Sequence, residues 1–375
     1  MEEPAFEVFE FLQKNIPPQQ IASDLSAKYD LSVDRGVAFV EEVEELIAEN
    51  THVEDEDEDE DEDDGCAQKN RDTLIQPIGK LWSEKYYLFN GVCICYKYYH
   101  HKLEAIFHPQ MAHLEIEELD GRVDEELNEE VREGVNYFHL FHQDKHFYMR
   151  SDDRLIGPWG LDELHFFKGK VSAEFLDKVY HREERDWMGV FHASAVSDGK
   201  NAIIMPGESG SGKSTSLAIL MAEGFSVMAD DFVPVEAKLA HVRMFPAAIS
   251  IKEGAWELVR GSSPDFGRSG EVYHKDASTR MIYLPPAIPA DPETTAAPVK
   301  ALVFVKYSQG AGLSMEEFPR HLAFQHLVTD SWISPVYENV ESFLDWFAEL
   351  PCYRLTYSDN NLLVSTIHKL FSDGL

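Results

Sequence analysis

The sequence predicts an α/β protein in which a β-rich lobe precedes a mixed α/β core. Two aromatic-rich segments, 85–99 and 137–150, alternate with a period of two, which is typical of antiparallel strands. A glycine-rich stretch at 207–214 lies between an apolar strand and an amphipathic helix, the order of elements from which α/β cores are built. Apolar side chains in the first fifty residues follow helical spacing, so a small helical segment is expected in front.

Composition and charge are those of a folded, strongly acidic protein. The chain has 375 residues, of which 44% are hydrophobic and 12% aromatic, enough for a sizeable core in two or three domains. Its formal net charge is −35, and residues 54–64 are eleven consecutive carboxylates, without which −24 remains. Such a surface repels nucleic acid and anionic membranes, so we expect neither as a partner.

We expect a cytoplasmic protein. The N-terminus lacks the basic region and apolar stretch of a signal peptide, and no apolar run reaches the roughly 18 residues of a membrane span. Its four cysteines are too few and too unevenly spaced for a disulfide framework. Cys93 and Cys95 with His100 and His101 have soft-ligand character, but no second cysteine pair completes a zinc site, so we expect no metal there.

Four segments are expected along the chain: a helical segment at 1–52, an acidic linker at 53–72, a β-rich lobe at 73–185 packed on the core, and the core at 186–375. Adjacent like charges repel, so the acidic run should be a flexible tether, with binding of cations or a basic peptide as the alternative. The polar segment 261–280 is either a mobile loop over a site or an ordinary surface loop.

Local patterns also predict individual elements. Residues 142–146 ("HQDKH") indicate a hairpin turn, and residues 172–184 a helix. In the core, "VFHASAV" and "NAIIMPG" are strands around a tight turn. A helix over 214–224, ended by Gly224, follows. The next strand, 225–231, ends on two aspartates.

The glycine-rich stretch carries a phosphate-binding pattern. Gly207, Gly212, Lys213 and Ser214 satisfy G-x-x-x-x-G-K-[ST], in which glycines let backbone N–H groups wrap around phosphate oxygens. The lysine neutralises the β- and γ-phosphates, and the serine hydroxyl ligates magnesium. We therefore expect ATP and Mg²⁺ as cofactors. The residues expected to bind ATP are Gly207, Ser209, Gly210, Ser211, Gly212, Lys213, Ser214 and Thr215.

The two aspartates suggest chemistry on the bound phosphate. A carboxylate after the strand that follows the loop helix is placed to hold magnesium, and one is enough for that role. The second can sit at the γ-phosphate and accept a proton from an incoming hydroxyl. Alternatively, it only faces solvent at the end of the strand.

The segment from His192 to Asp231 resembles the HPr serine kinase/phosphorylase family and its HPr-kinase-like relatives, which have a phosphoenolpyruvate-carboxykinase-like P-loop fold. The matching features are the loop 207–214, the Asp230–Asp231 pair and His192 in "HASAV". Weaker similarity in "FPAAISIKEGAWEL", "RMIYLPP" and "ALVFVKY" extends the resemblance over about 186–370. Thr215 replaces the glutamate that follows the loop serine in HPr kinases, so HPr itself and reverse phosphorolysis are not implied.

The resemblance implies roles for particular residues. Asp230 would be the catalytic base for a serine or threonine hydroxyl, Asp231 would place magnesium with Ser214, and His192 would lie beside the aspartates. Transferred phosphate needs one or two cations, for which Lys252 is the preferred candidate. The other candidates are Arg243, Arg280 and Lys306. HPr kinases are oligomeric, so a homo-oligomer is also implied.

The helical pattern over 6–50 resembles the helical part of a PqqD-type, winged-helix domain, which captures leader peptides of ribosomally made precursors by strand addition. The strands that normally precede these helices have no counterpart here, because Met1 lies only five residues before Phe6. A generic three-helix docking or dimerisation element is the alternative.

Together these features predict an ATP- and Mg²⁺-dependent kinase that phosphorylates a Ser or Thr hydroxyl of a ribosomally synthesised precursor peptide. The N-terminal segment would bind the leader, and the tether would let the core region reach the site. This combination resembles the precursor-peptide kinases associated with lasso-peptide pathways. The alternatives are an HPr-kinase-like kinase of protein serines or small molecules, and a nucleotide-gated peptide chaperone that transfers no phosphate.

Overall fold

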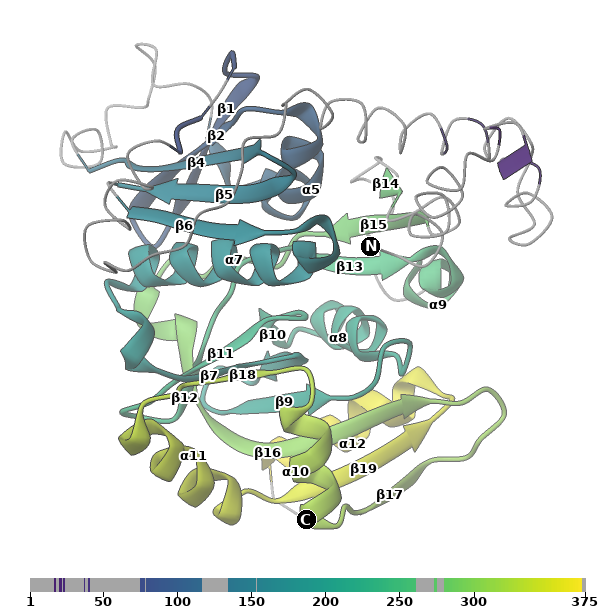
Figure 1. Ribbon diagram of the computed structural model, residues 1–375. Coiled ribbons are helices and arrows are strands. Elements are labelled where there is room, and N and C mark those ends of the chain that lie inside the picture. Colours follow the sequence, from purple (N-terminus) through teal and green to yellow (C-terminus); the bar gives the residue numbers. More distant parts are fainter. Residues whose placement is uncertain are drawn as a thin grey trace.

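The computed structural model describes residues 75–77, 79–116, 134–152, 154–260, 273–274 and 280–372, and six isolated positions between 17 and 40. These residues form a mixed α/β protein with three β-sheets (Figure 1). The expected acidic linker and most of the expected N-terminal segment and of the 261–280 loop lie outside them. In the described part of the chain, no helix has both the length and the apolar character to cross a membrane.

The first sheet lies within residues 83–159 and has the order β3-β1-β2-β4-β5-β6. Its strands are β1 (Ser83–Phe89), β2 (Val92–Tyr98), β3 (Glu115–Ile116), β4 (Asn136–Gln143), β5 (His146–Ser151) and β6 (Arg154–Trp159). The predicted hairpin turn is confirmed, because β4 and β5 pair antiparallel around Asp144 and Lys145. Both turn residues have positive φ (+51° and +67°), the geometry that matches the twist of two-residue hairpins.

Two helices accompany this sheet: α5 (His101–Met111), which continues into the 3₁₀ turn η1 (Ala112–Leu114), and α7 (Leu164–Tyr180), which follows the turn η2 (Leu161–Glu163). Helix α7 begins before the predicted residue 172 and ends before 184. It ends because His181 adopts the left-handed conformation, and its N–H reaches the carbonyls of Asp177 and Lys178. The turn η3 (Glu184–Asp186) then leads into the second sheet.

The second sheet has the order β10-β8-β9-β16-β12-β11-β7-β18, with β19 pairing on β16 and β17 on β19. Its strands are β7 (Trp187–Phe191), β8 (Ala193–Ser197), β9 (Ala202–Pro206), β10 (Ser226–Ala229), β11 (Val233–Glu236), β12 (His241–Arg243), β16 (Ala296–Tyr307), β17 (Ser314–Glu317), β18 (Trp332–Ile333) and β19 (Cys352–Tyr357). Strands β8 and β9 pair around a tight turn as predicted, but the predicted strand "VFHASAV" is divided at His192 between the end of β7 and β8. Strand β16 runs parallel to both β9 and β19.

Helices cover both faces of the second sheet. They are α8 (Lys213–Ala222), α10 (Arg320–Val328), α11 (Tyr337–Glu349) and α12 (Asn360–Ser372). Alternate residues of β9 and β16 enter two different apolar clusters: Ile203 packs with α8 and α12, whereas Ile204 packs with α10 and α11. This two-sided burial explains why these strands are almost wholly apolar.

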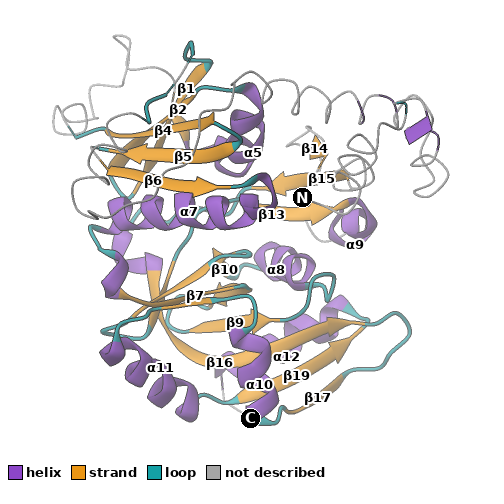
Figure 2. Cartoon of the chain, viewed as in Figure 1, coloured by secondary structure: helices purple, strands orange, loops and turns teal. Residues whose placement is uncertain are grey.

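The third sheet, β13-β15-β14, lies over α8 (Figure 2). It is made of β13 (Ile249–Lys252), β14 (Tyr273–His274) and β15 (Arg280–Leu284). Nearby are η4 (Glu253–Ala255) and α9 (Trp256–Arg260), and η5 (Pro292–Thr295) precedes β16. Ile249 and Ile251 of β13 pack into the α8 cluster, so Ser250 and Lys252 belong to the opposite face of this small sheet.

Helix α7 is the layer between the first sheet and the second (Figure 1). The Tyr180 hydroxyl donates to the Met244 carbonyl at 2.7 Å, and Trp187 Nε1 donates to Asp177 Oδ1 at 2.7 Å. Phe175 packs edge-on against Phe245 at 6.2 Å between ring centroids. The β-rich region and the core thus share one continuous apolar cluster.

Candidate functional site

The glycine-rich stretch forms a tight loop between β9 and α8. Gly212 caps α8 with φ +102°, and a Cβ there would lie 3.2 Å from Cβ of Tyr307. A Cβ on Gly207 would lie 2.7 Å from Ser211 Oγ. Glycine is therefore required at Gly212 by the backbone conformation, whereas a side chain at Gly207 would force the Ser211 hydroxyl to move. Gly210 also has positive φ (+84°).

The loop is closed by hydrogen bonds to its own backbone. Lys213 Nζ donates to the carbonyls of Gly207 at 2.5 Å and Glu208 at 3.3 Å, and Tyr307 N–H donates to the Ser211 carbonyl at 2.9 Å. Ser211 Oγ is buried and has no hydrogen-bond partner among the described residues. A buried hydroxyl without a partner is costly unless a ligand satisfies it, which fits a loop built to hold phosphate oxygens.

Lys213 is almost completely buried, with 5% of its surface exposed. Burial lowers the pKa of its ammonium group, whereas the charges of Asp231, Asp230 and Asp330 favour the protonated form. Lys252 lies close enough for its positive charge to disfavour the protonated form of Lys213. The loop lysine, the aspartate pair and Lys252 therefore lie near one another, with Lys252 at the end of β13 in the third sheet.

Asp230 is the most constrained of these groups. It directly follows β10 and is 5% exposed. Its Oδ1 accepts from Ser194 Oγ at 2.7 Å and from Ser214 Oγ at 3.0 Å, and its Oδ2 accepts from Ser250 N–H at 3.2 Å. Burial, helped by the charge of Asp231, raises its pKa to about 7 against the effect of these hydrogen bonds.

Asp231 differs from its neighbour in exposure and in backbone conformation. Its side chain is exposed, and its φ is +60°. The left-handed conformation is unusual outside glycine and is tolerated best by aspartate and asparagine. The first carboxylate is thus buried among three hydrogen-bond donors, whereas the second is accessible to solvent. The two aspartates therefore offer two different environments within one dipeptide.

His192 lies between β7 and β8, one residue before the strand that carries Ser194. Its backbone N–H donates to Ser331 Oγ at 3.1 Å, and Ser331 Oγ donates to the Leu327 carbonyl at 2.6 Å. This contact holds the turn that contains Asp330, close to Lys213. A role for the His192 ring stays a prediction, as do the ligand contacts expected of Ser209 and Thr215.

The remaining basic candidates are engaged elsewhere. Arg243 Nε lies 2.9 Å from Glu236 Oε1, and its guanidinium lies over the Tyr180 ring. Arg280 pairs with Glu253 at 2.6 Å and lies over Trp256. Exposed Lys252 ends β13, two residues after Ser250, whose N–H binds Asp230. Lys252 is close enough for its charge to act on Lys213, whereas exposed Lys306 lies on β16 next to Tyr307, whose N–H binds the loop at Ser211.

Magnesium bound with a nucleotide needs only one or two protein groups, because phosphate oxygens and water complete its octahedron. The described residues contain no group of three His, Cys, Asp or Glu side chains suited to a metal ion on their own. The paired Ser214 and Asp230 at the start of α8 nevertheless supply the hydroxyl and carboxylate that a magnesium–phosphate unit requires. The residues present therefore fit Mg²⁺ together with a nucleotide.

The two cysteines of β2 lie in the protein interior. Cys93 and Cys95 are buried, and burial raises their pKa to about 11 and about 12.

A separate hollow of about 820 Å³ lies along α7, lined by charged residues of α7, the β5–β6 turn and 182–185. Several of its side chains are already ion-paired, including Lys178 with Asp152 at 2.6 Å and Arg182 with buried Glu236 at 3.1 Å.

Sequence reasoning missed three parts of the site. Ser194 and the Ser250 backbone hold Asp230, and Asp330 approaches Lys213. The serine in "HASAV" was visible as a polar residue in an apolar strand, which is a usable signal. A backbone N–H has no sequence signal, and Asp330 lies in a turn far along the chain.

Comparison with known proteins does not assign the chain. No protein-family model matches it, and no curated protein is significantly similar to it. The geometry of the site therefore carries the functional inference.

Proposed function

We propose that this protein is an ATP- and Mg²⁺-dependent kinase with an HPr-kinase-like P-loop core, which phosphorylates a Ser or Thr hydroxyl of a ribosomally synthesised precursor peptide in the cytoplasm. The observation that carries the proposal is the contact of Ser214 Oγ with buried Asp230, directly behind a glycine loop that encloses Lys213. This combination of hydroxyl, carboxylate and buried cation provides the groups that bind a nucleoside triphosphate together with magnesium.

The chain's own residues would bind and orient the donor. Gly207 to Gly212 present backbone N–H groups, and the start of α8 adds the positive end of its dipole. Lys213 is placed to exchange its loop carbonyls for the β- and γ-phosphate oxygens, and Lys252 to approach the transferred group from the β13 side. Magnesium, when bound, bridges phosphate oxygens and neutralises developing charge.

The aspartate pair would supply the two remaining functions. One carboxylate would orient the Ser214 hydroxyl that ligates the metal. The other would take the proton that the acceptor hydroxyl loses. His192 lies in the segment just before Ser194 and would help to hold this part of the site in place. Because two carboxylates with different surroundings are present, both functions are available within one dipeptide.

The negative charge around the site and over the whole chain supports a peptide as the acceptor. Exposed Asp231 and Asp330 lie around Lys213, and the whole chain carries −35. These charges disfavour small anionic acceptors and favour a neutral or basic chain segment. The PqqD-like segment at 1–52 would bind the leader of such a peptide, and a homo-oligomer is compatible with this arrangement. A peptide tethered in this way reaches millimolar effective concentration at the site.

The test is intact mass spectrometry of candidate precursor peptides incubated with ATP, Mg²⁺ and the enzyme. The expected result is a gain of one phosphoryl group that is lost with Lys213→Met, a variant that keeps the buried aliphatic stem and removes its charge. Deletion of residues 1–52 should reduce activity on the full-length precursor while leaving activity on the isolated core peptide. ATP binding without any phosphopeptide product would refute peptide phosphorylation and favour the chaperone alternative.

A further inference from the structure

Residues 244–248, which connect β12 to β13, form a buried connection between the β-rich lobe and the core. Connections between strands usually run over the surface, because their backbone groups need hydrogen-bond partners. Here Met244, Phe245, Ala247 and Ala248 are each no more than 5% exposed. Their buried N–H and C=O groups must therefore bind other parts of the protein.

On the core side, the segment 244–248 is attached close to Asp230. The Phe245 N–H group donates to the Met228 carbonyl at 2.8 Å, and Met228 lies on β10, two residues before Asp230. The Phe245 ring also lies 5.0 Å, between ring centroids, from Phe232, which follows Asp230 by two residues. The segment therefore contacts the chain on both sides of this carboxylate.

On the other side, the segment 244–248 is attached to the β-rich lobe. The Tyr180 hydroxyl, at the end of α7, donates to the Met244 carbonyl at 2.7 Å. The Ala248 N–H group donates at 2.8 Å to the carbonyl of Gln110, which lies in the last turn of α5. Two helices of the lobe therefore hold the two ends of the segment.

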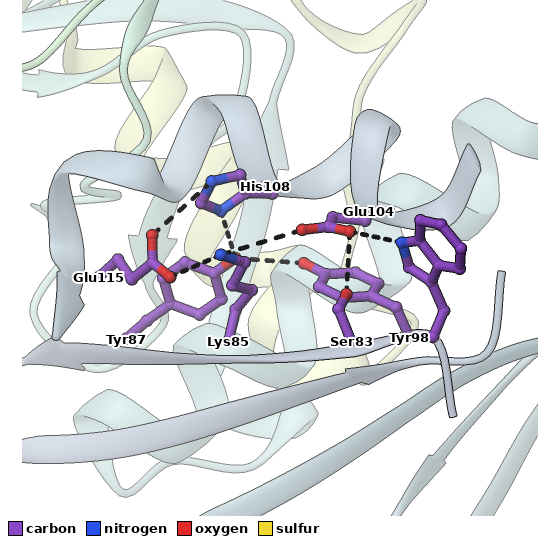
Figure 3. A network of polar contacts seen from close by, with 8 residues as sticks. Ser83, Lys85, Tyr87, Tyr98, Glu104, His108 and Glu115 are labelled. Atoms are coloured by element: carbon purple, nitrogen blue, oxygen red, sulfur yellow. Dashed lines mark hydrogen bonds and ion pairs between the residues drawn. The ribbon is translucent and has the colours of Figure 1, made fainter. Parts of the chain in front are cut away.

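Helix α5 is itself fixed to the first sheet by polar contacts. Figure 3 shows Glu104 and His108 of α5 turned toward β1, where the Glu104 carboxylate accepts from Ser83 Oγ at 2.9 Å. The His108 Nδ1 atom lies 3.0 Å from the hydroxyl of buried Tyr87. Gln110 follows His108 by two residues, so these contacts also fix the carbonyl that holds the segment 244–248.

Strand β13 begins directly after Ala248 and passes the phosphate site at the edge of the third sheet, whose order is β13-β15-β14. On the side away from β15, the Ser250 N–H group donates to Asp230 Oδ2 at 3.2 Å. Lys252 follows two residues later, so its side chain lies on the same face of the strand as that of Ser250. The place of Lys252 at the site therefore depends on where β13 begins.

We propose that the β-rich lobe positions the phosphate site: Tyr180 and the Gln110 carbonyl hold the segment 244–248, which sets where β13 places Lys252 beside the transferred phosphoryl group. The inference rests on the proposed kinase function. Tyr180 is a positioning residue, because it acts through Lys252 rather than on the substrate. The unit needed for transfer thus extends beyond the region 186–370, over which the sequence resembles HPr kinases, to helices α5 and α7.

Tyr180→Phe tests the proposal, because it removes the hydroxyl and keeps the aromatic ring against the apolar cluster. The first readout is hydrogen exchange of the full-length protein without ligand. Amides in 244–252 should exchange roughly two- to tenfold faster, the effect of losing one net hydrogen bond, while exchange in α8 stays unchanged. Tyr99→Phe, which removes a hydroxyl 3.0 Å from His139 Nδ1 in the same lobe, is the matched control and should leave both regions unchanged.

The second readout is phosphoryl transfer from ATP with Mg²⁺, to the precursor peptide and to water, in a double-mutant cycle of Tyr180→Phe and Lys252→Met. Lys252→Met should lower kcat by roughly 10²-fold, the usual effect of losing one group that stabilises developing charge. Tyr180→Phe should lower kcat by roughly two- to tenfold and leave KM for ATP within about twofold. In the Lys252→Met protein, Tyr180→Phe should change kcat by less than about twofold, because the lysine that it positions is absent.

Equal losses of kcat from Tyr180→Phe with and without Lys252 would show that Tyr180 acts through general stability, and would overturn the inference. Unchanged exchange in 244–252, or normal transfer by Lys252→Met, would overturn it as well. The kinase function would stand in each of these cases. Wild-type protein that transfers phosphate neither to peptide nor to water would overturn both the kinase function and the inference.

Discussion

Replacing His113 should make the protein less sensitive to acid. His113 lies in η1, and both its ring nitrogens are buried without a hydrogen-bond partner among the described residues. Burial lowers its pKa to about 4, against 6.5 in the unfolded chain. As the pH falls below 6.5, the unfolded chain takes up a proton that the folded chain resists. Stability that is present above pH 6.5 is therefore lost on acidification.

The size of the effect follows from the difference of about 2.5 pKa units between the two states. At about 1.36 kcal/mol per unit, the full loss is about 3 kcal/mol, of which about 2 kcal/mol is reached at pH 5. His113→Phe keeps a planar ring without a titrating group. Its free energy of unfolding relative to wild type should therefore improve by about 2 kcal/mol between pH 7.5 and pH 5.

The assay is urea unfolding followed by tryptophan fluorescence at pH 7.5, 6 and 5, with slopes compared to confirm that the same surface is exposed. His165→Phe, which removes an exposed histidine of α7, is the matched control. A difference between His113→Phe and wild type that stays constant from pH 7.5 to pH 5 would refute the reasoning.

Two further predictions concern the loop and the lobe interface. Gly212→Ala should weaken Mg²⁺–ADP binding by roughly tenfold or more, because alanine is strained at φ +102° and its Cβ would meet Tyr307. Gly199→Ala, at φ +89° in a remote turn with open space around it, is the control in the same calorimetric titration. Asp177→Asn should raise the melting temperature at pH 8 and not at pH 4, because burial raises the Asp177 pKa from 3.8 to about 6, so the cost of ionising its carboxyl group builds up between these pH values and is fully present at pH 8. Asparagine still accepts from Trp187 Nε1, so an equal shift at both pH values would contradict this explanation.

Local signals were sufficient for much of the core. The β8–β9 pair, the α8 helix after the glycine loop and the β4–β5 hairpin each depend on residues that are close in sequence. The start of α7 was missed because its first turn, "LHFF", is as aromatic as the strands before it. Hydrophobic period alone does not separate helix from strand in so short a run.

The different surroundings of Asp230 and Asp231 could not be predicted from the sequence. The register of β10 against β8 shifts between Val227 and Ala229, so alternation along the strand does not tell which aspartate turns inward. The partners of Asp230 come from Ser194 and Ser250, on strands brought to it only by the tertiary fold.

Strand β16 has a consequence for the order in which the protein assembles on the ribosome. The first sheet and α7 are complete once residue 180 has been synthesised, whereas β9 and β12 wait for β16, which spans Ala296–Tyr307. Until then, the apolar edge of β9 stays open to wrong pairing. Nascent chains stalled near residue 240 should therefore protect the first sheet from protease and bind chaperones through 187–206, and chains that include β16 should lose that binding.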